Sequence, residues 1–316
     1  MRAYVVNGDA HLQDVPDPQP PEGEALVRVL AAGVCNTDLE ILKGYMGFSG
    51  VLGHEFVGEV VQAENDHLIG KRVVGEINCV CGQCRYCRLE MPHHCLDRTV
   101  LGILNRDGAF AEYLTLPEAN LHVIPDPLRT DTAVFTEPVA AAFRITEQVS
   151  LTPDDSVVVL GDGKLGQLIA QVLTLSTKKV TCVGKHASKL ERVQQAGIAT
   201  AMLDDDIEEG ADIVVEATGS AAGFQRALEI VRPEGTVVLK TTVAGNTELD
   251  FSVPVINEVR VVGSRCGPFR PAIEALALGT VDVAPLISHT FPFDEIDEAI
   301  EAARQPDCLK VLLTMP

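Results

Sequence analysis

Four cysteines stand close together in one short, turn-rich segment of this chain, in a C-x2-C-x2-C-x7-C pattern. They are Cys81, Cys84, Cys87 and Cys95. Four thiolates so close in sequence can reach one tetrahedral Zn²⁺ and fill its coordination shell, which is the chemistry of a structural zinc site. Disulfides are the alternative, but the sequence shows no secretory signal and no disulfide framework. Hydrophilic spacers also argue against a cluster of buried apolar cysteines, so the pattern predicts zinc, with Cys79 as a bystander.

Other residue types that bind zinc occur singly in the first half of the chain. Cys35 is followed by Asp38, His54 is followed directly by Glu55, and Glu137 stands further on, before a proline. A lone Cys or His is more often a core residue than a ligand. Cys, His and Glu around one Zn²⁺ would leave a fourth position open, as in a catalytic site. The residue types therefore suit a second, catalytic zinc.

A glycine pattern further along the chain has the form that binds the pyrophosphate of a dinucleotide. An apolar strand pattern over 157–160 leads into G-x-G-x-x-G, and an apolar helix pattern follows. In such a loop the first glycine makes the tight turn, the second lets the backbone approach the pyrophosphate, and the third lets helix and strand pack closely. The N–H groups of the helix N-terminus then face the phosphates. A glycine-rich connection without function is the alternative. The predicted cofactor-binding residues of the loop are Gly161, Gly163, Lys164, Leu165 and Gly166.

The end of the next predicted strand bears on which dinucleotide binds. NAD sites usually place Asp or Glu there, about 20 residues after the loop, to bind the ribose 2′-hydroxyl. This chain has Gly184, Lys185 and His186 instead, and no acid until Glu191. The two basic residues favour NADP(H), with NAD(H) as the alternative if they form only a solvated turn. Gly184→Asp is then expected to reverse the preference. Within the loop, Asp162 must point away from the pyrophosphate or weaken its binding.

Composition limits the classes of partner. The chain has 316 residues, 46% of them hydrophobic and 22% charged, as expected of a globular protein of about two domains. Its formal net charge of −20 argues against nucleic acids and anionic membrane surfaces as partners. No apolar run reaches the roughly 18 residues of a membrane span. The 9 cysteines, without a recognisable targeting segment, indicate a reducing compartment, and we expect a cytoplasmic protein.

The elements that position these residues are of two kinds. Short β-branched runs separated by Gly and Pro, at 25–30, 57–61 and 71–75, predict a compact antiparallel, barrel-like domain. A helix is predicted over 139–149. After it, strand patterns alternate with helical stretches, which is typical of a doubly wound parallel sheet. These strand patterns begin at 157, 180, 213 and 236. The tail from about 268 is expected to pack back on the first domain.

Motifs along nearly the whole chain resemble those of the zinc-containing medium-chain alcohol/polyol dehydrogenase family. The motifs are Gly53-His54-Glu55-Phe-Val-Gly58, the four-cysteine lobe, Gly108-Ala-Phe-Ala-Glu-Tyr113, Thr136-Glu137-Pro138, the dinucleotide loop, Glu216-Ala-Thr-Gly219 and Gly263-Ser-Arg265. The resemblance implies an α/β protein with a GroES-like, β-rich catalytic domain, residues 1–138 completed by 268–316. It also implies a Rossmann dinucleotide-binding domain with a doubly wound parallel sheet, residues 139–267.

The same resemblance assigns roles in the first domain. It implies a catalytic zinc on Cys35, His54 and Glu137. A glutamate at the position of Glu137 resembles the sorbitol and glucose dehydrogenase branch of the family. Glu55 is similar to a family acid that can move onto the zinc, and Asp38 would orient the His54 ring. With the structural site, two zinc ions are expected per chain.

The implied reaction is hydride transfer between an alcohol and the nicotinamide. The zinc would lower the pKa of the alcohol and stabilise a zinc-bound alkoxide from which hydride leaves. Thr37 would hydrogen-bond that oxygen and pass its proton outward, with Glu40 as the candidate for the next step. Arg265 resembles a family arginine near the cofactor, with a surface ion pair as the alternative.

The sequence thus predicts a zinc-dependent oxidoreductase that uses NADP(H) and a small-molecule substrate, a secondary alcohol, polyol or sugar. The alternatives are an NAD-dependent relative acting on a bulkier hydroxyl substrate, a zinc-free quinone or enone reductase-like relative, and a non-catalytic relative. A zinc-free relative would lack Cys35, His54 and Glu137, and all three are present. The apolar run at 259–263, expected at a sheet edge, predicts a homodimer, or a homotetramer made from two dimers.

Overall fold

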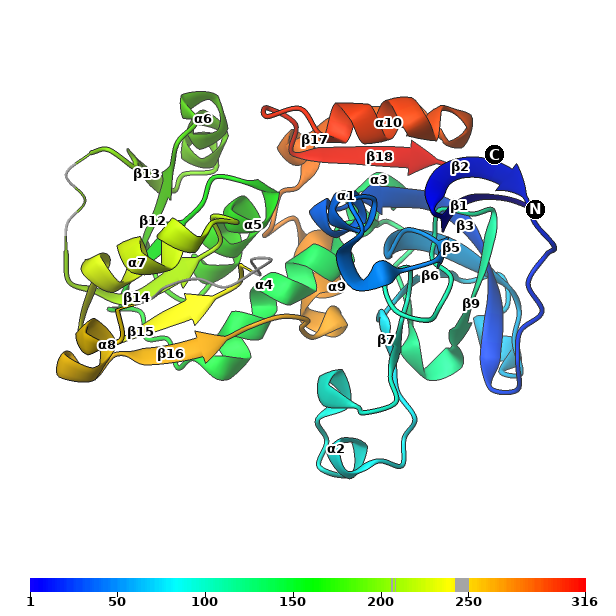
Figure 1. The fold of residues 1–316 in the computed structure, drawn as a ribbon, viewed down its shortest axis with the longest axis horizontal. Coiled ribbons are helices and arrows are strands. Elements are labelled where there is room, and N and C mark those ends of the chain that lie inside the picture. Colours follow the sequence, from blue (N-terminus) through cyan, green and yellow to red (C-terminus); the bar gives the residue numbers. More distant parts are fainter. Residues whose placement is uncertain (206, 208, 242–249) are drawn as a thin grey trace. The chain divides into compact units, whose positions relative to one another are not determined.

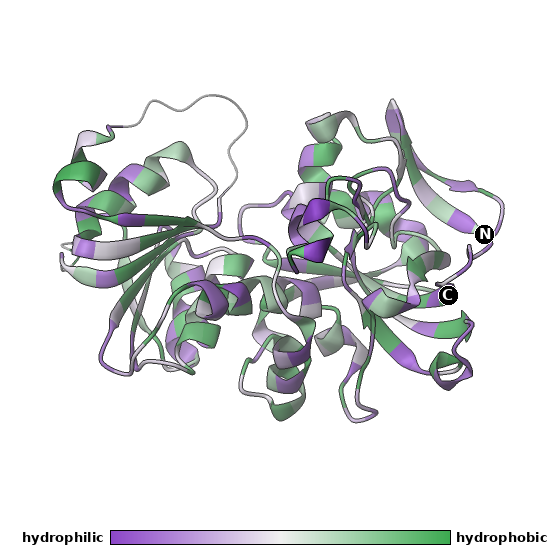
Figure 2. Cartoon of the chain, turned by 90° about the horizontal axis from the view of Figure 1, so that it is seen from below, coloured by the Kyte–Doolittle hydropathy of each residue, from purple (hydrophilic) through white to green (hydrophobic). Residues whose placement is uncertain are grey.

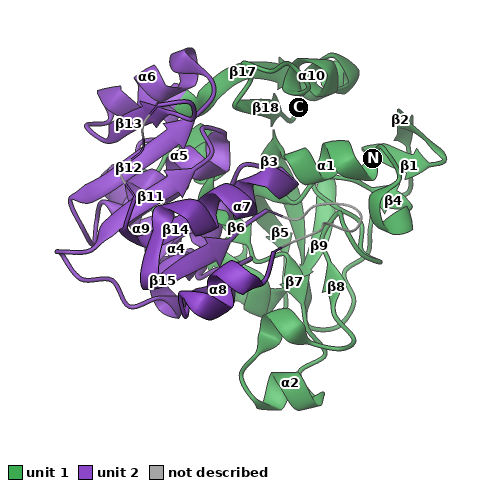
Figure 3. Ribbon diagram, turned by 60° about the vertical axis from the view of Figure 1, so that its left-hand side comes forward, with its two compact units in different colours: residues 1–137, 286–316 green, residues 138–285 purple. Residues whose placement is uncertain are grey.

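The computed structural model describes residues 1–205, 207, 209–241 and 250–316, which form two compact units (Figure 3). The first unit comprises Met1–Glu137 and Leu286–Pro316, and the second comprises Pro138–Pro285. The chain re-enters the first unit at 286, later than the expected 268. The reason is that the segment before helix α9 (Phe269–Leu278) packs within the second unit, against helix α4 (Thr136–Gln148). The two backbones are so close that a Cβ on Gly267 would be 1.9 Å from the carbonyl oxygen of Ala140.

Strands dominate the first unit (Figure 1). One sheet has the order β10-β6-β5-β3-β18-β17, with β9 also paired to β3, and another has the order β2-β1-β4. The pairs within them are antiparallel apart from β17 and β18. The bounds are β1 (Arg2–Asn7), β2 (Asp9–Asp14), β3 (Glu24–Val34), β4 (Gly50–Val51), β5 (Glu55–Gln62), β6 (Arg72–Gly75), β9 (Tyr113–Pro117), β10 (Leu121–Val123), β17 (Ile287–Pro292) and β18 (Lys310–Thr314).

The three strands predicted in the first unit lie within β3, β5 and β6 and the residue before β6. Strand β18 pairs with β3, with Val311 opposite Val34, so the C-terminal tail does pack on the first unit as expected. The short helices of this unit are α1 (Asn36–Ile41), α2 (Arg85–Arg88), α3 (Thr130–Ala133) and α10 (Ile296–Ala303). A separate two-stranded ladder, β7 (Asn78–Cys79) with β8 (Thr99–Val100), brackets the four-cysteine segment.

The second unit contains a six-stranded sheet whose paired strands are all parallel. Its order is β13-β12-β11-β14-β15-β16, which is the 3-2-1-4-5-6 order of a dinucleotide-binding fold. The doubly wound sheet predicted from the sequence is therefore confirmed. The strands are β11 (Ser156–Leu160), β12 (Lys179–Gly184), β13 (Ala199–Met202), β14 (Ala211–Glu216), β15 (Val231–Leu239) and β16 (Arg260–Gly263). The helices are α5 (Lys164–Leu173), α6 (Ala187–Gln195), α7 (Ala221–Ile230), α8 (Ser252–Ile256), α9 and α4, which begins at the boundary with the first unit.

The inner strands of this sheet contain apolar runs, such as 157–160 in β11, 213–215 in β14 and 237–239 in β15, and green segments mark such runs in Figure 2. Val158, Val214 and Val237 belong to one buried cluster, which also contains Ala227 and Leu228 of α7. Parallel strands that are covered on both faces require such continuous apolar runs. Burial of these side chains fixes β11 and β14 beside each other. It thereby also positions the loops that follow the carboxyl ends of the two strands.

Strand β16 is an edge strand of the six-stranded sheet, which is the position expected for the run at 259–263. Large apolar side chains near this edge are exposed, namely Phe251, Val255 and Ile256 around α8 and Val261 in β16. An exposed apolar edge is a surface that a second copy can cover. The homodimer or homotetramer therefore stays a prediction. Within the described residues, no helix combines the length and apolar character needed to cross a membrane.

Candidate active site

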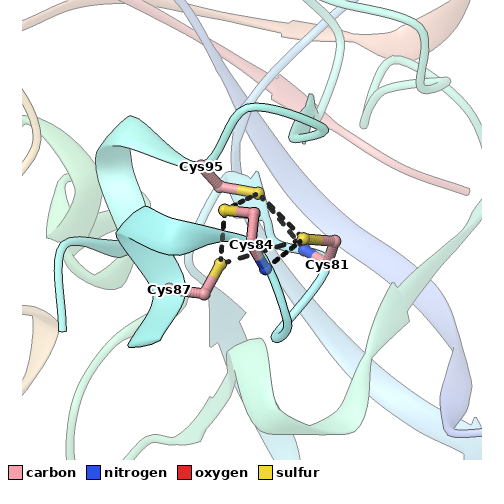
Figure 4. A group of neighbouring side chains, drawn as sticks. All are labelled: Cys81, Cys84, Cys87 and Cys95. Carbon is pink, nitrogen blue, oxygen red and sulfur yellow. Dashed lines mark hydrogen bonds between the residues drawn. The ribbon is translucent and has the colours of Figure 1, made fainter. Parts of the chain in front are cut away.

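The four-cysteine lobe brings its sulfur atoms together (Figure 4). The Sγ–Sγ distances that link Cys81, Cys84, Cys87 and Cys95 lie between 3.5 and 4.0 Å. A tetrahedron with Zn–S bonds of about 2.3 Å has edges of about 3.8 Å, so the four sulfurs fit a zinc ion. Cys79 lies outside this group, and burial raises its pKa to about 11, which keeps it a thiol.

Backbone N–H groups of the lobe point at several of its sulfur atoms. The N–H of Cys81 donates to Cys95 Sγ, and the N–H of Cys84 donates to Cys81 Sγ, both at 3.4 Å. Backbone N–H groups of Cys87 and Leu96 lower the pKa of Cys84 to about 6. Only the thiolate is a good metal ligand, so these donors prepare the sulfurs to bind a metal cation.

A second group of zinc-binding residue types forms at the ends of β3 and β5. Cys35 follows β3 and is the N-cap of α1, and His54 directly precedes β5. The ligand atoms of Cys35, His54 and Glu55 lie within 4.8 Å of one another. Burial opposes protonation of His54, but the charges of Asp38 and Cys35 outweigh it and raise the pKa of the imidazole well above its usual value. The group therefore favours a bound cation.

Glycines allow the close backbone packing that places His54. Gly53 has φ +94°, which is accessible to few other residues, and a Cβ there would be 2.4 Å from the Phe110 ring. A Cβ on Gly102 or Gly108 would each be 2.2 Å from the Gly53 carbonyl oxygen. The motif at 108–113 thus supports the segment that carries His54.

Asp38 lies beside both Cys35 and His54. Its Oδ2 accepts a hydrogen bond from the Cys35 N–H at 2.8 Å, and its Oδ1 lies 3.2 Å from His54 Nδ1. A carboxylate beside Nδ1 would leave Nε2 of the ring to hold a metal ion, since each ring nitrogen takes one partner. Thr37 is also close, with Oγ1 3.8 Å from Cys35 Sγ. Glu40 pairs with Lys43 at 2.8 Å.

Glu137 is not a member of this group. It lies in the first turn of α4, half-buried, at the last residue of the first unit. Glu55 takes part in the group instead. The assignment of Glu137 as the third zinc ligand therefore stays a prediction.

Glu55 has a second partner that the sequence reasoning missed. Lys310 in β18 forms an ion pair with Glu55, and both side chains are inaccessible, at 0% exposure. The Lys310 ammonium also lies 3.4 Å from the Val34 carbonyl oxygen and 5.5 Å from the centre of the Phe135 ring. Gly33 leaves room for the pair, because a Cβ there would be 2.6 Å from Glu55 Oε2. The signal in the sequence was a lysine at the start of an apolar strand.

Breaking this buried pair is expected to destabilise the first unit strongly. Glu55→Gln or Lys310→Met alone should each lower the free energy of unfolding by about 3–5 kcal/mol, because each leaves one buried charge without its partner. The double variant should lose much less, since both charges are gone. Urea unfolding of the four proteins measures this.

The exposed pair Arg270–Glu274 provides a matched control. Its single and double variants should change stability by no more than about 1 kcal/mol. Additive losses in the Glu55 and Lys310 variants would contradict the expectation of a coupled pair.

The dinucleotide loop joins β11 to α5, with Gly163 as the N-cap of the helix. A Cβ on Gly161 would be 2.4 Å from the Ala217 carbonyl oxygen, and one on Gly166 would be 1.9 Å from the Gly161 carbonyl oxygen. A Cβ on Gly163 would meet nothing within 4 Å. The first and third glycines thus permit tight packing, and the second leaves the open backbone that a pyrophosphate requires.

The adjoining motif after β14 is packed against this loop. The buried carboxylate of Glu216 accepts hydrogen bonds from the Thr218 N–H at 2.8 Å and from Thr241 Oγ1 at 3.0 Å.

Other predicted cofactor-binding residues lie in two parts of the second unit. Lys164 and Leu165 begin α5 and are half-buried. Arg265 is exposed, beyond β16, and its carbonyl oxygen accepts a hydrogen bond from the Lys240 ammonium at 2.9 Å.

Asp162 points away from the open face of the loop, toward the end of β12. Its Oδ2 accepts hydrogen bonds from the backbone N–H groups of Lys185 and His186, each at 2.7 Å. A Cβ on Gly184 would be 2.4 Å from Asp162 Cβ. The expectation that Gly184→Asp alone reverses the cofactor preference stays a prediction, but the structure adds an obstacle to it, because Asp162 already fills the space for that side chain.

Comparisons with known proteins cover both units. The alcohol dehydrogenase GroES-like domain matches residues 21–126, and the zinc-binding dehydrogenase domain matches residues 165–280. Sorbitol dehydrogenase of Halalkalibacterium halodurans is 30% identical over 342 residues, covering 99% of this chain and 99% of that protein.

Two solved structures resemble the whole chain and differ in cofactor. A zinc-binding dehydrogenase of Sinorhizobium meliloti 1021, bound to NADP, has a TM-score of 0.91 and 28% identity, covering 99% of this chain and 98% of that chain. An alcohol dehydrogenase of E. coli CFT073, complexed with NADH, has a TM-score of 0.91 and 27% identity, covering 99% of each chain. The fold is thus shared by proteins that bind either dinucleotide.

Proposed function

The chain belongs to the zinc-containing medium-chain alcohol/polyol dehydrogenase family, and from this premise we propose that it transfers a hydride between a secondary alcohol, polyol or sugar and NADP(H). The convergence of Cys35 and His54, with Asp38 behind the imidazole, carries the proposal. The sorbitol dehydrogenase relative supports a polyol among the candidate substrates. We further propose that the enzyme works in the cytoplasm, a reducing compartment that suits its thiol-rich sequence.

The first unit supplies the groups that hold and orient the substrate hydroxyl. Cys35, His54 and Glu137 would hold the catalytic zinc, and the lobe of Cys81, Cys84, Cys87 and Cys95 would hold the structural one. When bound, the catalytic zinc would act as a Lewis acid on the substrate oxygen. Thr37, adjacent to Cys35, is placed to take the hydroxyl proton, because its own hydroxyl both accepts and donates hydrogen bonds.

The second unit supplies the cofactor site. The open backbone at Gly163 and the N-terminus of α5 suit the pyrophosphate. Lys185 is exposed at the end of β12, where a cation favours a 2′-phosphate. Arg265 is proposed to offset pyrophosphate charge, as the resemblance implied.

The wild-type enzyme is expected to show a higher kcat/KM with NADP⁺ than with NAD⁺. One charge-assisted contact is worth about 1.5–3 kcal/mol, so Lys185→Ala should lower the NADP⁺-to-NAD⁺ ratio on the order of tenfold. Lys178→Ala changes an exposed lysine before β12 and should leave the ratio unchanged. A panel of alcohols, polyols and sugars, followed at the nicotinamide absorbance band, measures both substrate and cofactor use. Equal or better use of NAD⁺ by the wild type would contradict the preference.

A zinc-free reductase is the second candidate function, and the structure disfavours it. Such an enzyme has no use for a converging Cys–His pair with a carboxylate behind the imidazole. In this chain Cys35 and His54 approach each other, and Asp38 accepts a hydrogen bond from the Cys35 N–H and lies 3.2 Å from His54 Nδ1. Turnover of quinones or enones, without zinc and without alcohol oxidation, would favour that alternative.

A further inference from the structure

One acidic residue of the phosphate loop is not explained by the glycine pattern. The Asp162 side chain is only 8% exposed, although it follows the first glycine of a loop that must face an anionic pyrophosphate. A buried carboxylate is retained only where hydrogen bonds compensate for its lost hydration. The N–H groups of Lys185 and His186 provide this compensation, and so does the ring of His186, whose Nδ1 lies 2.9 Å from Oδ2.

The carboxylate occupies the space of a side chain that this chain lacks. An ideal Cβ on Gly184 would be 2.4 Å from Asp162 Oδ2 and 2.6 Å from Asp162 Cγ. Gly184 ends β12, the strand end where NAD sites carry the acid that binds the ribose 2′-hydroxyl. The carboxylate of Asp162 therefore lies where an acidic side chain at position 184 would lie.

The structure holds Asp162 in this position. The buried side chain of Gln167 donates from Nε2 to the Asp162 carbonyl oxygen at 2.9 Å and to the Lys189 carbonyl oxygen of α6 at 3.4 Å. Burial raises the pKa of the Asp162 carboxyl, but the hydrogen bonds of His186 and Lys185 outweigh it and lower the pKa overall. The group is thus a fixed, ionised carboxylate.

Asp162 keeps capacity for one more hydrogen bond. Its Oδ2 accepts both backbone bonds, whereas among the described residues the partner of Oδ1 is the His186 ring, at 3.1 Å. A carboxylate oxygen can accept two hydrogen bonds, so Oδ1 can still accept one from a hydroxyl.

We propose that Asp162 is a specificity-determining residue of the dinucleotide site. Its carboxylate takes the place of the acid at the end of the second strand, accepts the ribose 2′-hydroxyl of NAD(H) and repels the 2′-phosphate of NADP(H). The inference rests on the proposed dehydrogenase function and deepens it, because Asp162 limits the NADP(H) preference that Lys185 produces.

Asp162→Asn keeps the shape of the side chain and removes its charge. The ratio of the NADPH to the NADH association constant should rise by about tenfold or more over the wild type, because a like-charge contact is removed and a strong hydroxyl acceptor is weakened. Calorimetric titration with each cofactor measures the ratio without turnover. Adenosine 2′,5′-bisphosphate and 5′-AMP, titrated in the same way, restrict the measurement to the adenosine end.

A second pair of variants moves the carboxylate from the loop to the strand. Gly184→Asp alone places two side chains in one space and should weaken the binding of both cofactors. Asp162→Gly/Gly184→Asp removes this overlap and should restore NADH binding relative to Gly184→Asp. Unchanged NADH binding in Gly184→Asp, or no recovery in the double variant, would overturn the assignment of one shared space.

Two further variants test whether a change in the ratio comes from the loss of any negative charge or from a loss of stability. Asp154→Asn removes the same charge at an exposed position before β11 and should leave the ratio unchanged. If Asp162→Asn lowers the thermal midpoint, Asp162→Ser removes the same charge from a smaller side chain and should shift the ratio in the same direction.

A ratio within about twofold of the wild type in both Asp162 variants, or a fall in it, overturns the inference. A fall would mean that Asp162 positions His186 for the phosphate. A wild type that prefers NADH would contradict the proposed cofactor preference but not this inference, because the test is a change relative to the wild type.

Discussion

Cys35→Ser is expected to remove alcohol oxidation almost completely while the protein remains folded. A Lewis acid on the substrate oxygen is worth several kcal/mol, so kcat/KM should fall by about a thousandfold or more. The zinc content should fall from two ions to one per chain. The fold should persist, because Cys35 is only partly buried and Asp38 still caps its N–H. Elemental analysis, circular dichroism and steady-state kinetics on one preparation test all three expectations.

Cys308→Ser is the control for loss of a thiol as such. Cys308 is partly buried at the edge of a hydrophobic cluster and belongs to neither group of zinc-binding residues. This variant should keep two zinc ions and full activity. If Cys35→Ser also kept both ions and its activity, Cys35 would not be a ligand. If it unfolded, the metal at this site would be structural.

The two units differ in how much of their site the sequence predicts. The zinc lobe and the phosphate loop were predicted because their residues are neighbours in the chain. Cys81 to Cys95 and Gly161 to Gly166 need only a local turn to come together. The doubly wound sheet was predicted because apolar runs such as the one at Val157 can be buried only in covered parallel strands.

The contacts that sequence reasoning missed join distant residues. Glu55 and Lys310 are separated by 255 positions, and Asp162 lies 23 positions before Lys185. Nothing local to Glu55 indicates a buried ammonium next to it, because the ammonium is brought by β18 when it pairs with β3. Likewise, Gly184→Asp was expected to reverse the cofactor preference, and only the folded loop shows that Asp162 fills the space beside Gly184.

The four-cysteine lobe should depend on its metal for folding. Its helix α2 has 4 residues, its 3₁₀ turn Pro92–His94 has 3, and strands β7 and β8 have 2 each. Apolar side chains of the lobe, such as Leu89 and Leu96, are exposed and form no core. Elements this short are not stable alone in water. Bonds from the four sulfurs to a metal ion would then be the main source of stability for this segment.

Cys84→Ser is accordingly expected to unfold the lobe. Structural zinc contributes roughly 10–16 kcal/mol of apparent binding free energy, so the loss of one ligand should lower the stability of the lobe by more than about 4 kcal/mol. Trypsin should then cut after Arg85, Arg88 or Arg98 under conditions in which the wild type resists. The loss of activity should be smaller than in Cys35→Ser, because Cys35 and His54 lie on other elements.

Cys79→Ser is the matched control, because Cys79 is a buried thiol of the same lobe that lies outside the four-sulfur group. It should retain both zinc ions, resist trypsin and lose no more than about 2 kcal/mol of stability from the buried hydroxyl. The decisive comparison is the order of events on titration with a chelator. If the lobe is held by metal, proteolysis within it should begin as the second zinc ion leaves, well before the parallel sheet unfolds. A lobe that stays resistant to trypsin after both ions have gone would mean that its backbone contacts suffice, and the structural role of the metal would be wrong.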